Sequence, residues 1–310
     1  MIRLDPNDNV VVARKYVAAG TVVEDEGFTI LTNVPAGYKC SARDIKKGEE
    51  IRKYNTVIGF AAKDIPVGTM MHNHNIQFDD IDLDYAYGKD YERVDYVPKD
   101  QRRTFMGIRR SNGSVATRNY IGVIVCSNCA ATVARYICKN FSDEIMKKYP
   151  NVDGVVPFVT ELGCGMEQSG EPIDLLRRTI AGYIRNPNMG AAIVLAIGCE
   201  RNNIDKLFEA EKLEVSTLLR KMSIQEVGGT KKAVELGTKW VNEMLPIVNN
   251  VQRESCSAEH LMVALECGGS DGFSGLSANP ALGKAMDILV KNGGTCILSE
   301  TTEVFGAEHI

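Results

Sequence analysis

The sequence predicts an α/β protein in two parts, a small all-β domain at residues 1–78 and a mostly parallel α/β domain at residues 104–310. Up to residue 78, short segments rich in Val, Ile, Thr and Tyr are separated by glycines that recur every 9 to 17 residues, as short strands require. Beyond residue 120, apolar runs alternate with amphipathic helical patterns, which is typical of βαβ units around a parallel sheet.

Composition excludes several classes of protein. The 310 residues contain 36 Lys and Arg against 40 Asp and Glu, so the formal net charge of −4 does not suit a nucleic-acid-binding surface. The chain has no apolar run of about 18 residues that could span a membrane. It opens on the polar MIRLDPNDNV instead of a secretory signal, and its nine cysteines are an odd number. We expect a cytoplasmic homo-oligomer with reduced thiols and a small-molecule substrate.

The first domain is built from repeated turn chemistry. Its expected strands lie in the segments NVVVARKYV, GTVV, FTILTNV, EEIRKYNTVIGFAA and GTMMHNHNI. The phrases AAGTVV, DIKKGEEI and DIPVGTMM each place a glycine turn before a strand, which we interpret as recurring turn chemistry rather than an internal repeat. Residues 79–103 are dense in charge and tyrosine and are predicted to be a linker, either laid against a domain or solvated.

The second domain is predicted to be Rossmann-like. Its expected strands are YIGVIV, GVVPFVT, AAIVLAIG, VSTLLR, LMVALE and TCILS, with helical patterns between them. The strands are unbroken apolar runs, as expected where helices cover both faces of a parallel sheet.

Cysteines follow four of these strands. In open α/β sheets, ligands bind beyond the carboxyl ends of the strands. We therefore predict that some of Cys129, Cys164, Cys199 and Cys267 converge on an iron or iron–sulfur site, with thiol pKa values lowered at helix N-termini. The alternative is that cysteine is simply a small apolar residue suited to crowded strand ends.

Two further motifs could bind an anion. The loop CGGSDGFSG, with Gly268, Gly269, Ser270 and Asp271, is a plausible anion cradle, or else a structural turn. Asn112-Gly113 predicts the tip of a small hairpin. Arg109 and Arg118 flank that tip and could hold a substrate carboxylate, although surface arginines are common.

The MHNHN segment contains two of the four histidines of the chain. On a strand, His72 and His74 would share one face and could hold one divalent metal ion; in a loop they could do so less rigidly. Solvated surface histidines are the alternative.

Taken together, these motifs resemble the altronate and galactarate dehydratase family. The matching phrases are DNVVVA, HNHN, RRSNGSVATRN, NVDGV, GCG, IGCERN and ECGGSDGFSGLSANPALG. The resemblance implies an N-terminal SAF domain of the β-clip fold. It also implies loss of water from a sugar acid to give a 2-keto-3-deoxy acid, assisted by Fe2+ or Mn2+.

The resemblance also suggests residue roles. It makes His72 and His74 candidates for metal ligands or acid–base groups, with Glu161 and Glu200 as alternative bases. The four strand-end cysteines match cysteines of the family motifs, and an iron–sulfur cluster is a further option. Arg118, Asn119 and the Gly268–Asp271 loop match positions expected to bind carboxylate and hydroxyl groups.

The resemblance leaves the substrate and the activity open. D-altronate is favoured over galactarate, with a sulfolactate lyase-like relative also considered. Because members of the family are longer and TEVFGAEHI normally continues, we expect a C-terminally truncated hydro-lyase, and whether it is active alone stays open. A fragment that binds a sugar acid or a subunit without catalysis is the alternative. An oxidoreductase is disfavoured by the lack of a GxGxxG motif.

Overall fold

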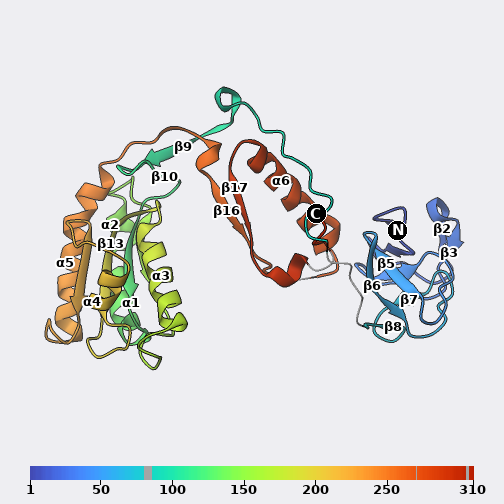
Figure 1. Cartoon of the computed structure of the whole chain (residues 1–310), viewed down its shortest axis with the longest axis horizontal. Helices are drawn as coiled ribbons and strands as arrows, with labels where there is room; N and C mark the ends of the chain where they lie inside the picture. The colour runs from blue at the N-terminus through green and yellow to red at the C-terminus, as the bar shows by residue number, and fades with distance from the viewer. Residues whose placement is uncertain (80–85, 270, 305–306) are drawn as a thin grey trace. The chain divides into compact units, whose positions relative to one another are not determined.

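The computed structural model describes residues 1–79, 86–269, 271–304 and 307–310. It consists of two compact units, one formed by Met1–Arg102 with Leu261–Ile310 and the other by Arg103–His260 (Figure 1). The stretch 104–310, predicted as one domain, is therefore divided between the units after residue 260. The predicted fold class, a small β domain followed by a parallel α/β sheet, is confirmed.

The N-terminal β domain contains small antiparallel sheets. One has the order β1-β4-β7, another the order β5-β6-β8, and β2 pairs with β3. The strands are β1 (Val10–Val12), β2 (Val22–Val23), β3 (Phe28–Thr29), β4 (Lys39–Ser41), β5 (Glu50–Lys53), β6 (Thr56–Ala61), β7 (Met70–Met71) and β8 (Ile76–Gln77). Alternate residues of these short strands fill two adjacent apolar clusters, which include Val11 and Ile30 in one and Ile51 and Met71 in the other.

The DNVV motif stabilises this domain. Asp8 is only 3% exposed, and its carboxylate accepts the N–H groups of Tyr54 at 2.9 Å and Asn55 at 2.7 Å. Both tyrosine and asparagine have φ of 57°, a left-handed conformation that the β5–β6 turn requires. Asn9 adds two hydrogen bonds to the backbone of β5, its amide donating to Glu50 O and its Oδ1 accepting the N–H of Arg52. The motif thus has a clear structural role.

Replacing Asp8 with alanine is expected to destabilise the β5–β6 hairpin by about 2 kcal/mol, because two turn N–H groups lose their acceptor. Hydrogen exchange of residues 50–61 in the intact chain should show protection reduced by roughly thirtyfold. Asp5→Ala is the matched control, since its exposed carboxylate accepts a local N–H, that of Asn7. Equal protection in the two variants would contradict the role given to Asp8.

The Arg103–His260 unit is centred on a four-stranded parallel sheet of order β12-β11-β13-β14. The strands are β11 (Tyr120–Val125), β12 (Gly154–Phe158), β13 (Met189–Ala196) and β14 (Leu219–Ser223). The chain first moves from β11 to β12 and then returns to the other side of β11, so the order reverses between β11 and β13. Such a reversal is where open α/β sheets bind ligands.

Helices cover both faces of this sheet (Figure 1). The helices α1 (Ala131–Lys139) and α5 (Thr230–Asn249) pack on one face, and α3 (Glu171–Arg185) and α4 (Ile204–Ala210) pack on the other. A further short helix, α2 (Asp143–Met146), follows α1. Burial on both faces explains why the two central strands, β11 and β13, are unbroken apolar runs.

An antiparallel sheet completes this unit, with β9 (Thr104–Arg109) between β10 (Val115–Ala116) and β15 (Glu254–Ser257). The predicted hairpin is confirmed, because β9 pairs with β10 and Gly113 turns the chain with φ of 84°.

The remaining elements belong to the other unit. The strands β16 (Met262–Leu265) and β17 (Thr295–Leu298) are parallel and are connected through a π-helical turn, Ser274–Ala278, and α6 (Asn279–Lys291). A short 3-10 turn, Thr301–Val304, follows β17. The expectation that β16 continues the large parallel sheet is wrong, since its pairing partner is β17.

The described part of the predicted linker contacts these C-terminal elements. Gly88 N–H donates to Glu308 O, Asp90 N–H to His309 O and Val97 N–H to Lys291 O. Residues 80–85 of the linker lie outside the described part. In the described ranges, no helix has the length and apolar character needed to cross a membrane.

Candidate functional site

Three predicted cysteines lie at the carboxyl edge of the four-stranded sheet. Cys129 follows β11, Cys164 follows β12 and Cys199 follows β13, so they surround the point where the strand order reverses. Backbone hydrogen bonds connect their loops, from Asn128 N to Leu162 O at 3.0 Å and from Asn202 N to Gly163 O at 2.9 Å. The structure thus brings together three of the four cysteines, while Cys267 belongs to the other unit.

The thiols of Cys129 and Cys164 interact directly. Their hydrogen bond, followed by the nearby negative groups of Cys199 and Glu200, raises the pKa of the Cys164 thiol. The sequence had predicted a lowered pKa from a helix N-terminus, and for Cys164 this is wrong. A neighbouring thiol that becomes negative opposes ionisation of the second thiol, which raises its pKa.

Cys164 is expected to react with iodoacetamide more slowly than an ordinary exposed thiol at about pH 8, because a raised pKa leaves less thiolate. In Cys129→Ser the pKa should fall, so the Cys164 alkylation rate should rise by a factor of roughly two to ten. Peptide mass spectrometry of metal-free protein measures this rate.

Two buried thiols serve as controls in that experiment. Burial raises the pKa values of Cys40 and Cys138 to about 12, so neither should be modified in the folded protein. A Cys164 rate unchanged by Cys129→Ser would contradict the thiol–thiol interaction.

A buried polar network, which the sequence analysis missed, supports this edge. Asn202 is 0% exposed; its Nδ2 donates to Cys126 O at 3.0 Å, and its Oδ1 accepts from Arg177 Nε at 3.3 Å. Arg177 is 7% exposed, and its Nη2 and the Oγ of Ser127 are buried without a hydrogen-bond partner. In the sequence, an arginine on an amphipathic helix cannot be distinguished from a surface residue. The IGCERNN motif, which contains Asn202, was the sequence signal for this network.

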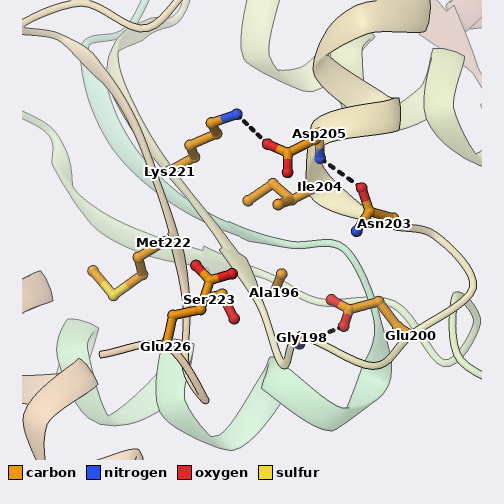
Figure 2. Close-up of a pocket in the computed structure, with 10 residues that line it drawn as sticks. All are labelled: Ala196, Gly198, Glu200, Asn203, Ile204, Asp205, Lys221, Met222, Ser223 and Glu226. Carbon is orange, nitrogen blue, oxygen red and sulfur yellow. Dashed lines mark hydrogen bonds and ion pairs between the residues drawn. The ribbon is translucent and has the colours of Figure 1, made fainter. Parts of the chain in front are cut away.

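The predicted base Glu200 has a mainly structural environment. It is 6% exposed, and its carboxylate accepts the N–H groups of Ile197 at 2.9 Å and Gly198 at 2.6 Å. It also lines a polar cavity of about 120 Å³ at the ends of β13 and β14, beside the ion pair between Lys221 and Asp205 (Figure 2). Pockets for small molecules usually measure about 300–1,000 Å³, so this cavity is too small for a six-carbon acid. The other candidate base, Glu161, is exposed on the loop after β12.

The predicted carboxylate-binding residues lie elsewhere in the Arg103–His260 unit. Arg118 and Asn119 precede β11, at the end of the sheet opposite to the cysteines. Asn119 is buried, and its amide donates to Asn151 O at 2.7 Å and Val248 O at 2.9 Å. The guanidinium of Arg118 pairs with Asp153 at 3.1 Å, and that of Arg109 pairs with Glu254 at 2.6 Å. The structure does not bring these three residues to the cysteine edge.

The histidine pair lies in a turn between β7 and β8, so of the two placements considered for HNHN the loop is correct and the strand is not. Asn75 holds this turn, accepting His72 N–H at 2.9 Å and donating to Met70 O at 3.0 Å. His72 and His74 are both exposed, and the His72 ring packs against the Tyr38 ring with 5.4 Å between centroids. A metal or acid–base role for the pair stays a prediction.

The glycine-rich loop after β16 has a partly structural role. The Oδ1 of Asp271 accepts the N–H groups of Phe273 at 2.7 Å and Ser274 at 2.9 Å, and these bonds lower the pKa of its carboxyl. Gly268 and Gly269 face open space. Ser270 lies outside the described residues.

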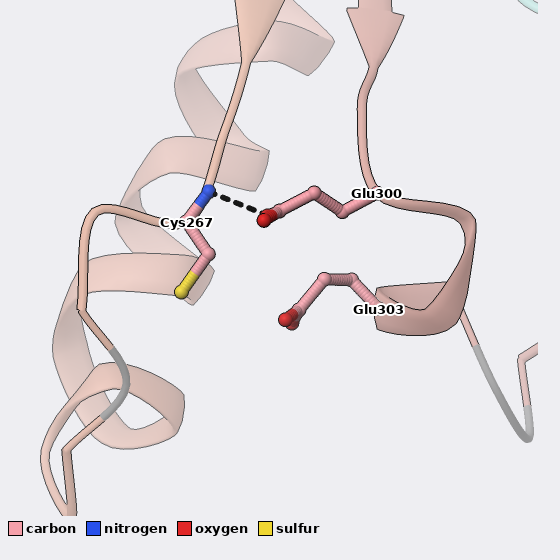
Figure 3. A group of neighbouring side chains, drawn as sticks. All are labelled: Cys267, Glu300 and Glu303. Atoms are coloured by element: carbon pink, nitrogen blue, oxygen red, sulfur yellow. Dashed lines mark hydrogen bonds between the residues drawn. The ribbon is translucent and has the colours of Figure 1, made fainter.

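Cys267, at the start of that loop, has acidic neighbours. Its Sγ and one carboxylate oxygen each from Glu300 and Glu303 all lie within 4.8 Å of one another (Figure 3). Within the described ranges this is the one group of three convergent His, Cys, Asp or Glu donors. A thiolate with two carboxylates suits a divalent transition metal such as Fe2+ or Mn2+. Neither glutamate was among the predicted site residues.

Three family models match the chain in succession. They are the altronate/galactarate dehydratase SAF domain at residues 1–79, the second domain of D-galactarate dehydratase/altronate hydrolase at 107–249, and the C-terminal domain of D-galactarate/altronate dehydratase at 258–310. The chain belongs to the altronate/galactarate dehydratase family.

Curated relatives agree with this assignment to the family. Altronate dehydratase of Escherichia coli (strain K12) is 33% identical and that of Bacillus subtilis (strain 168) is 32% identical, each over 100% of this chain and 61% of the relative. Galactarate dehydratase (L-threo-forming) of E. coli is 33% identical, over 100% of this chain and 60% of the relative. The chain therefore spans about 60% of the length of these family members.

Proposed function

We propose that the protein is a hydro-lyase that removes water from a sugar acid to give a 2-keto-3-deoxy acid. The observation that carries this proposal is the ordered match of three dehydratase domain models along the chain. The loops at the reversal point of the sheet support it, because that point is a usual ligand-binding position.

The reaction needs a base and an acid. A base takes the proton from C2, beside the carboxylate, and the hydroxyl on C3 leaves as water after accepting a proton. The enol that results loses the proton of its C2 hydroxyl, takes a proton from solvent at C3 and becomes the 2-keto acid. His72, His74 and Glu161 are exposed groups able to move these protons, whereas the carboxylate of Glu200 is occupied by backbone N–H groups.

A bound divalent metal ion would supply Lewis-acid stabilisation of the negative charge that develops on the substrate carboxylate. Two donor sets of this chain fit such an ion. The thiols at the sheet edge are soft donors, and the group of Cys267, Glu300 and Glu303 combines soft and hard donors.

D-altronate is our favoured substrate, because HNHN followed by DDIDLDYAYGKDY is more similar to the altronate branch. YPNVDGVV is more similar to the galactarate branch, and the relatives of both kinds are equally identical to the chain. Galactarate is therefore the second candidate.

Parallel assays of 2-keto-3-deoxy acid formation from D-altronate and galactarate, with Fe2+ or Mn2+ added anaerobically, test this choice. We expect higher kcat/KM for D-altronate. A higher value for galactarate would reverse the choice of substrate. Binding of either acid without product would instead support a non-catalytic sugar-acid-binding protein.

A further inference from the structure

Two of the three cysteines at the carboxyl edge of the four-stranded sheet lie on loops that contact each other. Cys129 follows β11 and Cys164 follows β12. The N–H of Asn128, the residue before Cys129, donates to Leu162 O at 3.0 Å. A Cβ atom on Gly163 would lie 2.2 Å from a backbone oxygen of the segment that follows β11, so the two chain segments approach as closely as a glycine allows. Backbone contacts therefore hold the two cysteines beside each other.

The two thiols interact, and an oxidant can reach both. A hydrogen bond joins Cys164 to Cys129. Cys129 is exposed and Cys164 is partly exposed, whereas four other cysteines of the chain are buried, namely Cys40, Cys126, Cys138 and Cys256. Neither residue of the pair lies in an α-helix or a β-strand. Small changes of side-chain and loop conformation can thus bring the two sulfur atoms to the bonding distance of about 2.05 Å.

We propose that Cys129 and Cys164 form a redox-modification site, at which hydrogen peroxide converts the two thiols to a disulfide. A thiol pair that is both accessible and in contact is the arrangement in which an oxidised cysteine meets a second thiol at once. Thiol–disulfide exchange with a dithiol restores both thiols, so the modification is reversible.

The oxidation is balanced over two steps. The Cys129 thiolate attacks one oxygen of hydrogen peroxide, the O–O bond breaks, and a sulfenic acid forms while hydroxide leaves. The Cys164 thiolate then attacks the Cys129 sulfur, the S–S bond forms, and the sulfenic oxygen leaves as a second hydroxide. The protons that the two thiols released convert both hydroxides to water. The two thiols lose two electrons in total, and the peroxide receives them. Cys129 reacts first because it is the more exposed of the two.

The disulfide changes the edge of the sheet where open α/β sheets bind ligands. It takes two of the three thiols away as soft donors, and it links the loop after β11 covalently to the loop after β12. That oxidation lowers the rate of dehydration rests on the proposed function, whereas formation of the disulfide does not.

Tryptic peptide mapping of the metal-free intact chain, before and after treatment with hydrogen peroxide, tests this site. Trypsin releases Cys129 in residues 119–135 and Cys164 in residues 149–177. We expect the oxidised chain to give these two peptides as one cross-linked species, lighter than their sum by two hydrogen atoms, which dithiothreitol separates again. Because residues 119–135 also contain Cys126, the variant Cys129→Ser identifies the linked thiol, and it should abolish the cross-link.

Cys199→Ser is the matched control, since Cys199 follows β13 at the same edge and is also exposed. Its cross-link should equal that of the unmodified chain. In Cys164→Ser, dimedone should label the sulfenic acid on Cys129, and failure to label it would overturn the assigned first step. Circular dichroism confirms folding of each variant.

The proposal would be overturned by a chain that forms no link between the two peptides, by a link that survives Cys129→Ser, or by a link that is lost in Cys199→Ser. The map of the unmodified chain decides whether the link forms even if a serine variant does not fold. Equal rates of dehydration by the reduced and the oxidised chain would overturn the effect on catalysis. A normal cross-link in a chain that makes no product from any sugar acid would count against the proposed function alone.

Discussion

Gly163→Ala is expected to lower the free energy of unfolding of the Arg103–His260 unit by about 3 kcal/mol. Gly163 has φ of 96°, a left-handed value that alanine adopts only with strain. A Cβ atom there would lie 2.2 Å from Cys126 O and 2.8 Å from Ser127 Cα, both backbone atoms that cannot move independently. The loop carrying Cys164 would have to move away from β11, which would separate Cys164 from Cys129.

Urea unfolding followed by tryptophan fluorescence measures this effect, because Trp240 is the single tryptophan and lies in α5 of the same unit. Gly165→Ala is a sharp control, since a Cβ at Gly165 meets no atom within 4 Å and its φ is not left-handed. We expect the control to unfold within about 0.5 kcal/mol of the unmodified chain. Similar stability of the two variants would show that the close approach at Gly163 is unimportant.

Asn202→Ala is expected to destabilise the same unit by about 3 kcal/mol. The substitution removes two buried hydrogen bonds, one to Cys126 O and one from Arg177 Nε. The buried guanidinium of Arg177 already has one nitrogen, Nη2, without a hydrogen-bond partner. The substitution would also remove the partner of its Nε. The ion pair of Arg177 with Asp174, at 3.9 Å, would remain, but loss of a hydrogen-bond partner from a buried charged group is costly.

The adjacent Asn203→Ala is the control for this prediction. Asn203 caps α4, accepting the N–H groups of Asp205 and Lys206, so its loss should cost about 1 kcal/mol. Urea unfolding of both variants by Trp240 fluorescence should therefore separate them by roughly 2 kcal/mol. If Asn203→Ala were the more destabilised variant, the buried network would not support the sheet edge as described.

The fold could be predicted where local pattern determines structure. The glycine turns between the strands of the N-terminal domain and the unbroken apolar runs of β11 and β13 are both visible in the sequence. The strand β14 has the sequence LRKMS and begins near the end of the predicted VSTLLR segment. The partner of β16 could not be predicted, because an apolar run does not specify which neighbouring strand it pairs with. Whether HNHN is strand or turn could not be decided from the sequence, because the turn depends on hydrogen bonds of the Asn75 side chain to the backbone of His72 and Met70.

The candidate site was predicted less completely than the fold. That the cysteines after β11, β12 and β13 lie at one edge of the sheet could be predicted, because parallel strands place their carboxyl ends at the same edge. The structure brings those loops together. Asn119 was predicted to bind ligand, but its amide is buried and donates to two backbone carbonyl groups. Burial of a single asparagine could not be predicted from the sequence. Glu300 and Glu303 were missed because a parallel strand pair, unknown from sequence, is what places them beside Cys267.

Proton NMR of D-altronate incubated with the intact chain in D2O, with Fe2+ present, tests sugar-acid dehydration most directly. Dehydration across C2 and C3 predicts loss of the C2 proton signal and a 2-keto-3-deoxy product with one deuterium at C3, since the enol takes its last proton from solvent. If D-altronate and galactarate both keep every carbon-bound proton under these conditions, the account of this protein as a sugar-acid dehydratase is contradicted.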